Sequence, residues 1–379
     1  MPLEKETQTR QKCLFLALLP ITLTGAWLYG LCVPLYGLIS ALFCLVLDHI
    51  CYKMRKMPRP QGDLSPLITG LILSLLMPAG VPLSLLFGAD LIAICIAKHP
   101  FGGYGKNAFN PAAVGFGMML VLYPDALTTY PVPLSQQTVW GNHAQFSQGL
   151  VSTLAEGAIP RQDLFDLFLG KVAGPVAQSS VLILLGCFLF LLFTKTIDWQ
   201  VPVFALVTYV GFALLFPRAL YDFYLSPLYE LACGSIVFGT VFMATDPVTL
   251  PATGIGRSFC GFLLGIFVML FRMFGQFGPG FCFGLLLINA LSPVMDKRAA
   301  KIKDFFGDAR RTTRNLIHKE RRYASVSQSV WNREEVPSGE FSQEEDLRLM
   351  EDTKAQINSF LHSLEKEPDP SNSREEEGK

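Results

Sequence analysis

The sequence predicts an all-α protein that crosses a membrane many times, and three observations support this prediction. Apolar residues make up 51% of the chain and charged residues only 16%, whereas soluble domains carry about 25% charged residues. The charges are also uneven, with 18 in the 235 residues from 61 to 295 and 33 in the 83 residues from 297 to 379. Long apolar runs recur between residues 13 and 295. We therefore expect a membrane domain over residues 13–296 and a soluble tail after it.

Ten apolar segments are candidate transmembrane helices. A helix needs about 20 residues to cross the hydrocarbon core, or about 17 at the lower limit. The segments are 13–29, 35–52, 64–78, 83–98, 108–123, 179–195, 201–217, 231–245, 258–274 and 279–295. Two of them, 64–78 and 231–245, are too short to cross alone and end in proline-containing turns, so we expect these to be broken helices.

The positions of Lys and Arg predict the orientation of the chain. Basic residues cluster before the first span, after the second and after the last, at Lys5, Arg10, Lys12, Lys53, Arg55, Lys56, Arg59, Lys297, Arg298, Lys301 and Lys303. With ten spans all three clusters lie on one side, which makes both termini cytoplasmic, including the N-terminal residues 1–12. The loop 124–178 is then extracytoplasmic, and its four acidic residues outnumber its two basic ones.

A weak internal similarity suggests two inverted repeats of five helices each. Residues 70–78 and 239–247 are short apolar stretches that end in proline, and each precedes a full-length span. That span ends near a basic residue, Lys98 or Arg272, and a glycine-rich turn follows. Paired broken segments of this kind indicate inverted repeats with a binding site where the halves meet. The alternative is a chance similarity between glycine- and proline-rich sequences.

The first candidate site is the polar segment that follows the fourth span. Its candidate residues are Lys98, Phe101, Gly102, Gly103, Asn107 and Asn110. Glycines let backbone amides approach a planar or anionic ligand, and the N-terminus of the next helix favours negative charge. The alternative is a tight cytoplasmic turn with an asparagine helix cap.

The second candidate site is the turn that contains Thr245 and Asp246, at the end of a half-span. Asp246 could contact an ion or a flavin ring, or it could cap the following helix.

We interpret His99 as an interfacial residue whose side chain extends toward the membrane surface. No other histidine clusters with His99, so we expect no metal site. The nine cysteines show no C-x-x-C spacing, so we expect no iron–sulfur cluster or disulfide framework. The zero net charge also gives no reason to expect a nucleic-acid partner.

A series of motifs along the chain resembles a known family. They lie at residues 63–70, 98–111 (KHPFGGYGKNAFNP), 166–170, 199–202, 242–248 (FMATDPV) and 289–296 (NALSPVMD). In this order they are similar to the membrane subunit shared by two redox-driven ion pumps. These are the sodium-translocating NADH:quinone reductase, in its B subunit, and the Rnf ferredoxin:NAD complex, in its D subunit. The resemblance covers residues 13–296.

This resemblance implies a ten-span subunit, with a fold similar to that of urea channels, in a bacterial cytoplasmic membrane. It implies a flavin cofactor, FMN or riboflavin, and electron transfer between NADH or ferredoxin partners and quinone within a larger complex. The quinone-side glycines of the family match Gly102 and Gly103. The ion transported could be sodium or a proton. Two alternatives remain, a channel or permease on the same scaffold and a scaffold subunit without a redox cofactor.

The outer loop departs from the family pattern. In the family a motif of the kind D-x-x-[ST]-x-A-T carries FMN on its last threonine, through a phosphodiester bond. Residues 144–150 and 149–155 are the two possible registers here, and neither has the leading Asp or the acceptor Thr. We therefore expect a non-covalent flavin, with Thr153 or Ser152 as the fallback attachment site.

The C-terminal tail predicts two further segments. Residues 297–341 form a basic cytoplasmic segment, with ten Lys or Arg against three acidic residues over 297–322. This segment could bind anionic lipid headgroups or form a solvated helix. Residues 342–379 begin with a capping box, Ser342 and Glu345, and we expect a short partner-binding helix followed by a disordered acidic end.

Overall fold

The computed structural model of the chain describes residues 4–135, 145–157, 163–178, 180–218, 226–232, 235–274, 280–298 and residue 355. All except residue 355 belong to the first of two units into which the chain divides, Met1–Phe306 and Gly307–Lys379. The lipid-binding interpretation of residues 297–341 and the helix expected after residue 342 lie almost entirely outside the described residues.

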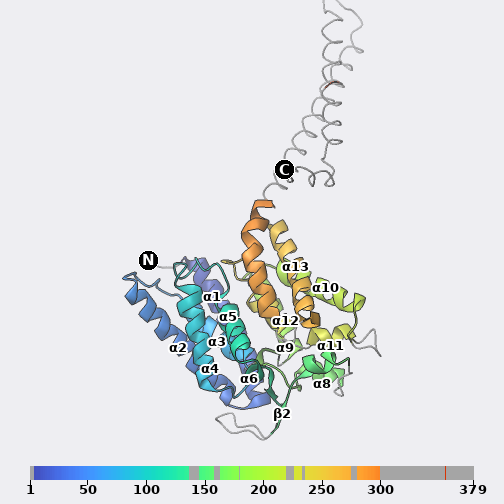
Figure 1. Ribbon diagram of the computed structural model, residues 1–379. Helices are drawn as coiled ribbons and strands as arrows, with labels where there is room; N and C mark the ends of the chain where they lie inside the picture. Colours follow the sequence, from blue (N-terminus) through green and yellow to red (C-terminus); the bar gives the residue numbers. More distant parts are fainter. Residues whose placement is uncertain are drawn as a thin grey trace, which may run out of the picture. The chain divides into compact units, whose positions relative to one another are not determined.

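The first group of helices follows the predicted spans closely (Figure 1). It comprises α1 (Lys5–Tyr29), α2 (Cys32–Met54), α3 (Ser65–Leu76), α4 (Leu83–Leu91), the π-helical segment η1 (Ile92–Lys98) and α5 (Pro111–Leu122). Proline occupies the first turn of both α3 and α5, where its missing N–H costs no helical hydrogen bond. Gly30, with φ of 88°, ends α1 and lets the chain reverse into α2.

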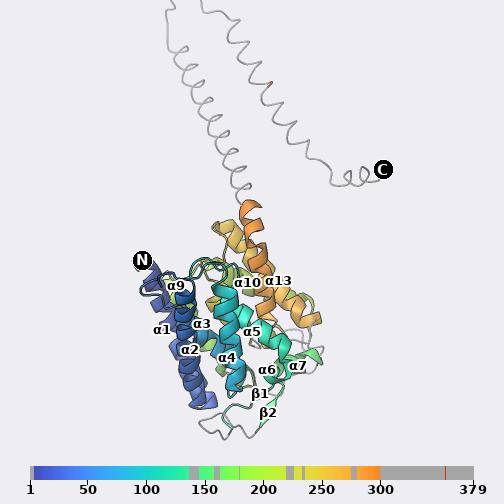
Figure 2. The same cartoon turned by 60° about the vertical axis from the view of Figure 1, so that its left-hand side comes forward.

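The predicted outer loop is itself folded. It contains α6 (Pro124–Thr128), β1 (Tyr130–Pro131), β2 (Phe146–Ser147), α7 (Leu150–Ala155), α8 (Leu164–Leu169) and the 3-10 turn η2 (Val176–Gln178), with β1 and β2 paired antiparallel. Leu150, Leu154 and Leu167 form a small apolar core with Tyr229 of the second half. In both views this region lies at the opposite end of the helices from the N-terminus (Figures 1 and 2).

The second group of helices contains one difference from the prediction. It comprises α9 (Val181–Phe193), α10 (Gln200–Leu215), α11 (Ser226–Ala232), α12 (Ile236–Phe242), α13 (Gly254–Phe274) and a helical stretch over residues 281–298. The short segment expected at 231–245 contains α12 and only the end of α11, which lies largely before the expected start. Beyond α12, the residue before Pro247 is biased away from helical backbone, which agrees with the turn that follows.

Helix length and surface composition identify a polytopic membrane protein. Among the described helices α1, α2 and α13 are long and apolar enough to cross a bilayer, and α3, α5, α9 and α10 are shorter apolar helices. Large apolar side chains stand exposed on them, such as Leu23 (68%), Phe193 (84%) and Val207 (65%). A surface of this kind is stable in contact with lipid and would aggregate in water.

Close contacts between helix backbones position the polar residues inside the protein. A Cβ atom on Gly70 of α3 would lie 2.6 Å from the Ser40 carbonyl of α2, and one on Gly265 of α13 would lie 2.5 Å from the Ala205 carbonyl of α10. Small residues at such crossings let membrane helices pack tightly. The first crossing lies between α2 and α3, and the second lies between α10 and α13.

Candidate functional site

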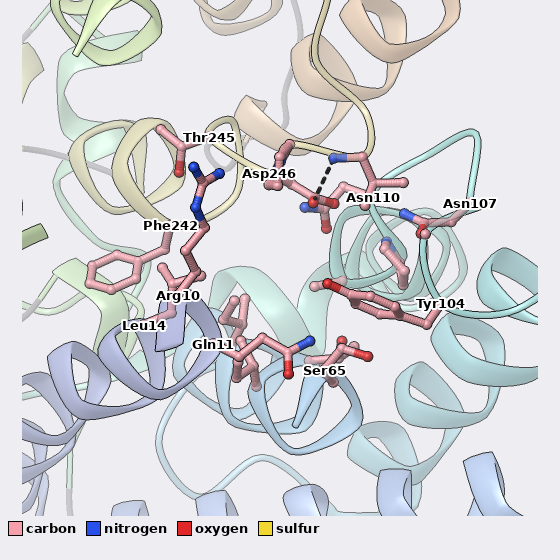
Figure 3. A pocket seen from close by; sticks show the side chains of 18 of the residues that line it. Arg10, Gln11, Leu14, Ser65, Tyr104, Asn107, Asn110, Phe242, Thr245 and Asp246 are labelled. Carbon is pink, nitrogen blue, oxygen red and sulfur yellow. Dashed lines mark hydrogen bonds between the residues drawn. The ribbon is translucent and has the colours of Figure 1, made fainter. Parts of the chain in front are cut away.

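A cavity of about 490 Å³ lies where the two groups of helices meet. Its walls come from α1, α3, the segment after η1 and the turn after α12. Figure 3 shows Arg10 extending from α1 toward Thr245, and Tyr104 directing its hydroxyl into the cavity. The two candidate sites identified in the sequence therefore contribute to one cavity, although they lie far apart in the chain.

Asn110 joins the two sides of this cavity. Its side-chain oxygen accepts a hydrogen bond from Ala113 N–H at 3.2 Å and so caps α5. Its side-chain amide donates to the Met243 carbonyl at 3.1 Å, and its backbone N–H donates to the Asn289 side chain at 2.9 Å. The helix-cap interpretation of Asn110 is thus correct, and the same side chain also reaches the second half of the protein.

Asp246 forms a polar turn at the cavity rather than a helix cap. Its carboxylate accepts a hydrogen bond from Val248 N–H at 3.1 Å, and α13 begins only at Gly254. Burial raises the pKa of Asp246 above its ordinary value, and hydrogen bonds from Val248 and Asn107 offset part of this rise. Thr245 donates its hydroxyl to the Val241 carbonyl at 2.6 Å, which leaves only its lone pairs for a ligand.

Tyr104 adds an aromatic ring and a hydroxyl to the cavity, although it was not among the site residues predicted from the sequence. Burial raises the pKa of Tyr104 to about 12, and the nearby acidic side chains Asp63 and Asp246 contribute to the rise. The phenol is therefore neutral at physiological pH and can donate a hydrogen bond.

The glycine pair does not line this cavity. Gly102 and Gly103 have φ of 126° and 90°, and a Cβ on Gly103 would lie 2.6 Å from the Tyr52 hydroxyl. The same hydroxyl accepts a hydrogen bond from Tyr104 N–H at 3.2 Å. Phe101 is 47% exposed and also lies outside the cavity lining. The fold of the turn thus requires glycine at position 103, whatever ligand approaches it, and a role for the pair in quinone binding stays a prediction.

Lys98 lines the cavity and belongs to a buried cluster of charges. Its ammonium group lies 2.9 Å from Asp48 Oδ1, 3.7 Å from Asp63 Oδ2 and 2.9 Å from the Ser65 hydroxyl. The side chain is only 3% exposed. Because buried charges need partners, these contacts occupy the ammonium group, and Lys98 is not a free cation directed at a ligand.

His99 is part of the same cluster, so its interpretation as an interfacial side chain is wrong. It is 4% exposed, and its Nε2 lies 3.0 Å from Asp48 Oδ1. The backbone explains why the His99 side chain is buried. The backbone N–H of His99 donates a hydrogen bond to the Ile94 carbonyl, five residues earlier, in the π-helical pattern of η1. Single π turns of this kind are frequent at functional sites. The sequence signal that was missed is Asp48, a charged residue within the apolar span 35–52.

A second buried cluster occupies a corresponding place in the other half. Arg272, in the last turn of α13, lies 2.9 Å from the Glu230 carboxylate of α11 and also contacts the Tyr209 hydroxyl. Arg218 pairs with the other Glu230 oxygen at 3.1 Å. In both groups of helices, therefore, a cation at the end of η1 or α13 pairs with an acidic residue, which lies just before α3 or in α11.

The outer-loop hydroxyls lie on α7. Ser152 and Thr153 both donate to the Gly149 carbonyl, at 2.7 and 3.5 Å, and both side chains are partly buried. Within the part of the chain that the structure describes, no group of three or more His, Cys, Asp or Glu side chains is arranged to hold a metal ion.

These features define a class of protein, a polytopic membrane protein with a polar cavity and buried ion pairs beside short helices. The chain belongs to the NQR2, RnfD, RnfE family, whose model matches residues 3–303. The family resemblance predicted from the motifs is thus confirmed.

Individual relatives cover most of the membrane domain. The chain is 32% identical over 311 residues to the D subunit of the proton-translocating ferredoxin:NAD(+) oxidoreductase complex of Clostridium ljungdahlii, covering 78% of this chain and 90% of the relative. It is 30% identical over 309 residues to the D subunit of the ion-translocating oxidoreductase complex of Stutzerimonas stutzeri, covering 74% and 87%. The corresponding D subunit of Aliivibrio salmonicida is 31% identical over 327 residues, covering 77% and 93%.

Proposed function

We propose that this chain is the D subunit of a redox-driven, ion-translocating oxidoreductase in a bacterial cytoplasmic membrane. In this role it passes electrons through a bound flavin between NADH or ferredoxin partners and quinone, and it acts only with the other subunits of the complex. Family membership and the names of its relatives support this function. At the level of individual residues, the proposal is supported by the cavity between the two groups of helices.

The cavity suits a flavin ring in size and chemistry. Its volume of about 490 Å³ falls within the range of small-molecule and cofactor sites, about 300–1,000 Å³. Phe242 and Leu14 supply apolar walls, and Gly105 presents backbone with open space where a side chain would stand. Tyr104 and Asn107 supply polar groups for the ring edge.

Arg10 is the residue best placed to balance negative charge on a ligand in this cavity. Its only ion pair among the described residues is with Glu6 at 2.8 Å, and both side chains are substantially exposed. Such an exposed ion pair contributes little to stability, so Arg10 can leave Glu6 and pair with a ligand at a low cost in free energy. A bound flavin supplies one- and two-electron chemistry; Arg10 would favour its anionic reduced form, while Asp246 and Asn107 would orient its polar edge.

We further propose ten membrane spans in two inverted repeats, with both termini cytoplasmic and the loop 124–178 outside. The correspondence between Lys98 and Arg272, each buried and paired with an acidic residue, supports this arrangement. The contact between Asn110 and Asn289 would then join the fifth helices of the two repeats.

Flavin analysis of the intact complex tests the proposed function. Acid denaturation of the purified complex should release the flavin that the wild-type chain binds. A denaturing gel viewed under ultraviolet light should show no fluorescent band for this chain. Arg10→Gln should weaken flavin retention about tenfold, equivalent to about 1.4 kcal/mol, whereas Lys12→Gln, an exposed residue on the same helix, should leave it unchanged.

Two results would contradict parts of this proposal. A fluorescent band that survives denaturation and disappears in Thr153→Val would show that the flavin is covalent. Absence of flavin from both fractions would favour the channel or scaffold alternative.

A further inference from the structure

A row of buried polar side chains follows one face of α2. Ser40, Cys44 and Asp48 recur at intervals of four residues, which places them on the same side of the helix. Each of them is 0% exposed. The row begins in the middle of α2 and ends at the cluster formed by Asp48, Lys98 and His99. Polar side chains in such a position are costly in a membrane helix, and they usually have a function.

Asp90 of α4 lies opposite the start of this row. It is fully buried, at 0% exposed, and its Oδ1 lies 2.7 Å from the Ser40 hydroxyl. The Cys44 thiol also faces its carboxyl group. In the described part of the chain no Lys, Arg or His forms an ion pair with Asp90, and its Oδ2 makes no hydrogen bond that meets ordinary geometric criteria.

The other elements packed against Asp90 bring no charge to it. The helices α3 and α5 contain no Asp, Glu, Lys, Arg or His. The nearest charged groups along the row are Asp48 and Lys98, which already pair with each other. A carboxylate at Asp90 would therefore be an uncompensated charge inside the membrane domain, which is strongly unfavourable.

The hydrogen-bond geometry around Ser40 indicates which form Asp90 takes. Ser40 Oγ lies 2.7 Å from Asp90 Oδ1 and 2.9 Å from the Gly70 carbonyl oxygen. A hydroxyl has a single hydrogen to donate, and the Gly70 carbonyl can only accept. If Asp90 were ionised, one of these two close oxygen pairs would contain no hydrogen. Both contacts are satisfied when protonated Asp90 donates to Ser40 and Ser40 donates to Gly70.

We propose that Asp90 is a proton-binding site in the membrane interior, connected through Cys44 to the Asp48–His99 pair. In each transfer the O–H bond of the Asp90 carboxyl breaks and an N–H bond forms on the His99 imidazole, or the reverse; no electron moves. Successive side chains of the row are separated by about 6 Å along the helix, and within the row the Cys44 thiol stands between Ser40 and Asp48. A role for this site in ion translocation rests on the proposed function, whereas proton binding by Asp90 does not.

A purely structural role makes a different prediction. In that case Asp90 and Ser40 only hold α2, α3 and α4 together through the Gly70 carbonyl. Asp90→Asn keeps this role, because its amide can donate to Ser40 as the protonated acid does. The same substitution removes the ability to release a proton. The asparagine variant therefore separates the two roles without removing the hydrogen bond.

The experiment uses the complete complex in sealed proteoliposomes. Dicyclohexylcarbodiimide, which reacts with protonated carboxyl groups in apolar surroundings, should modify Asp90 at neutral pH, as detected by mass spectrometry of the peptide. The exposed Asp198 (51%) should stay unmodified. In Asp90→Asn the number of protons moved per electron should fall to the level of ionophore-treated vesicles, with assembly and flavin content unchanged.

Each remaining outcome decides one of the two proposals. Absence of the adduct at Asp90, or full proton translocation by Asp90→Asn, would overturn the proton-binding role. If Asp90→Asn fails to assemble, the adduct on the wild-type complex still decides the question. Adduct formation in a wild-type complex that couples no electron transfer to translocation would support proton binding and overturn the proposed function.

Discussion

The backbone N–H of Asn110 donates a hydrogen bond to the side-chain oxygen of Asn289 at 2.9 Å, across 179 residues of sequence. Both residues are almost fully buried, at 6% and 4% exposed. Asn110 opens α5 and Asn289 lies in the helical stretch 281–298. The contact thus fixes the start of one helix against another at the wall of the cavity.

Removal of the Asn289 side-chain oxygen should destabilise this junction. In Asn289→Leu the buried N–H of Asn110 loses its partner, which costs about 1–3 kcal/mol. We expect a lower Tm of the purified complex and weaker flavin retention. Leu287→Ala, an outward-facing residue of the same helical stretch at 38% exposed, is the control. Equal effects of the two substitutions would show that the contact does not hold the junction.

Neutralisation of Lys98 should be among the most damaging single changes in the membrane domain. Lys98→Met leaves the buried Asp63 carboxylate without an ion-pair partner among the described residues and leaves Asp48 with only Arg59 and His99. Breaking a buried pair costs about 3–5 kcal/mol. We expect loss of the assembled complex, measured as the amount of this chain that stays with the complex after detergent extraction. Lys106→Met, an exposed residue in the following turn, should assemble normally. Normal assembly of Lys98→Met would contradict the charge cluster.

Two glycines of the turn after η1, Gly103 and Gly105, differ in whether an added Cβ atom would meet a neighbouring side chain. Gly103 and Gly105 both have positive φ, but a Cβ on Gly103 would lie 2.6 Å from the Tyr52 hydroxyl, whereas one on Gly105 meets nothing within 4 Å. Gly105→Ala should cost only the backbone strain, about 1–2 kcal/mol. Gly103→Ala should lower Tm further, and Tyr52→Phe should restore part of that loss. Independent effects of the two substitutions would exclude the steric explanation.

The stability of the protein should depend on pH through Asp246. Because the pKa of Asp246 in the folded protein is raised above the ordinary value of 3.8, this carboxyl favours the folded state most at low pH. Its contribution is lost as the pH rises from that value through the raised one. The Tm of the wild type should therefore fall relative to the Tm of Asp246→Asn as the pH rises over this interval. A difference that stays constant with pH would contradict the raised pKa.

Cysteine labelling from outside intact cells tests the orientation. Gln148 lies exposed in the outer loop and Gln61 lies exposed between α2 and α3. An impermeant maleimide should label Gln148→Cys in intact cells, and it should label Gln61→Cys only after the membrane is opened. The native cysteines provide the background, measured in the parent protein. The reverse pattern would invert the proposed topology.

Much of the helical framework could be predicted from the sequence, because an apolar run long enough for a membrane helix is a local property of the chain. The segments at 35–52 and 258–274, for example, lie within α2 and α13. The cap at Asn110 was also predictable, because a side-chain oxygen three residues before its N–H partner needs no distant group. The helix α11 ahead of α12 and the folded core within residues 124–178 were not predicted, since both depend on contacts with remote segments.

The sequence by itself determined the family, the apolar helices and the two polar segments that form the cavity. Only the tertiary structure decided that Lys98 and His99 share the Asp48 carboxylate, and that Asp90 faces Ser40. Hydropathy states how much of a helix is apolar, but it does not state which side chains of two helices face each other. A buried polar group is stable only when a partner from another helix meets it, and that pairing is set by how the helices pack.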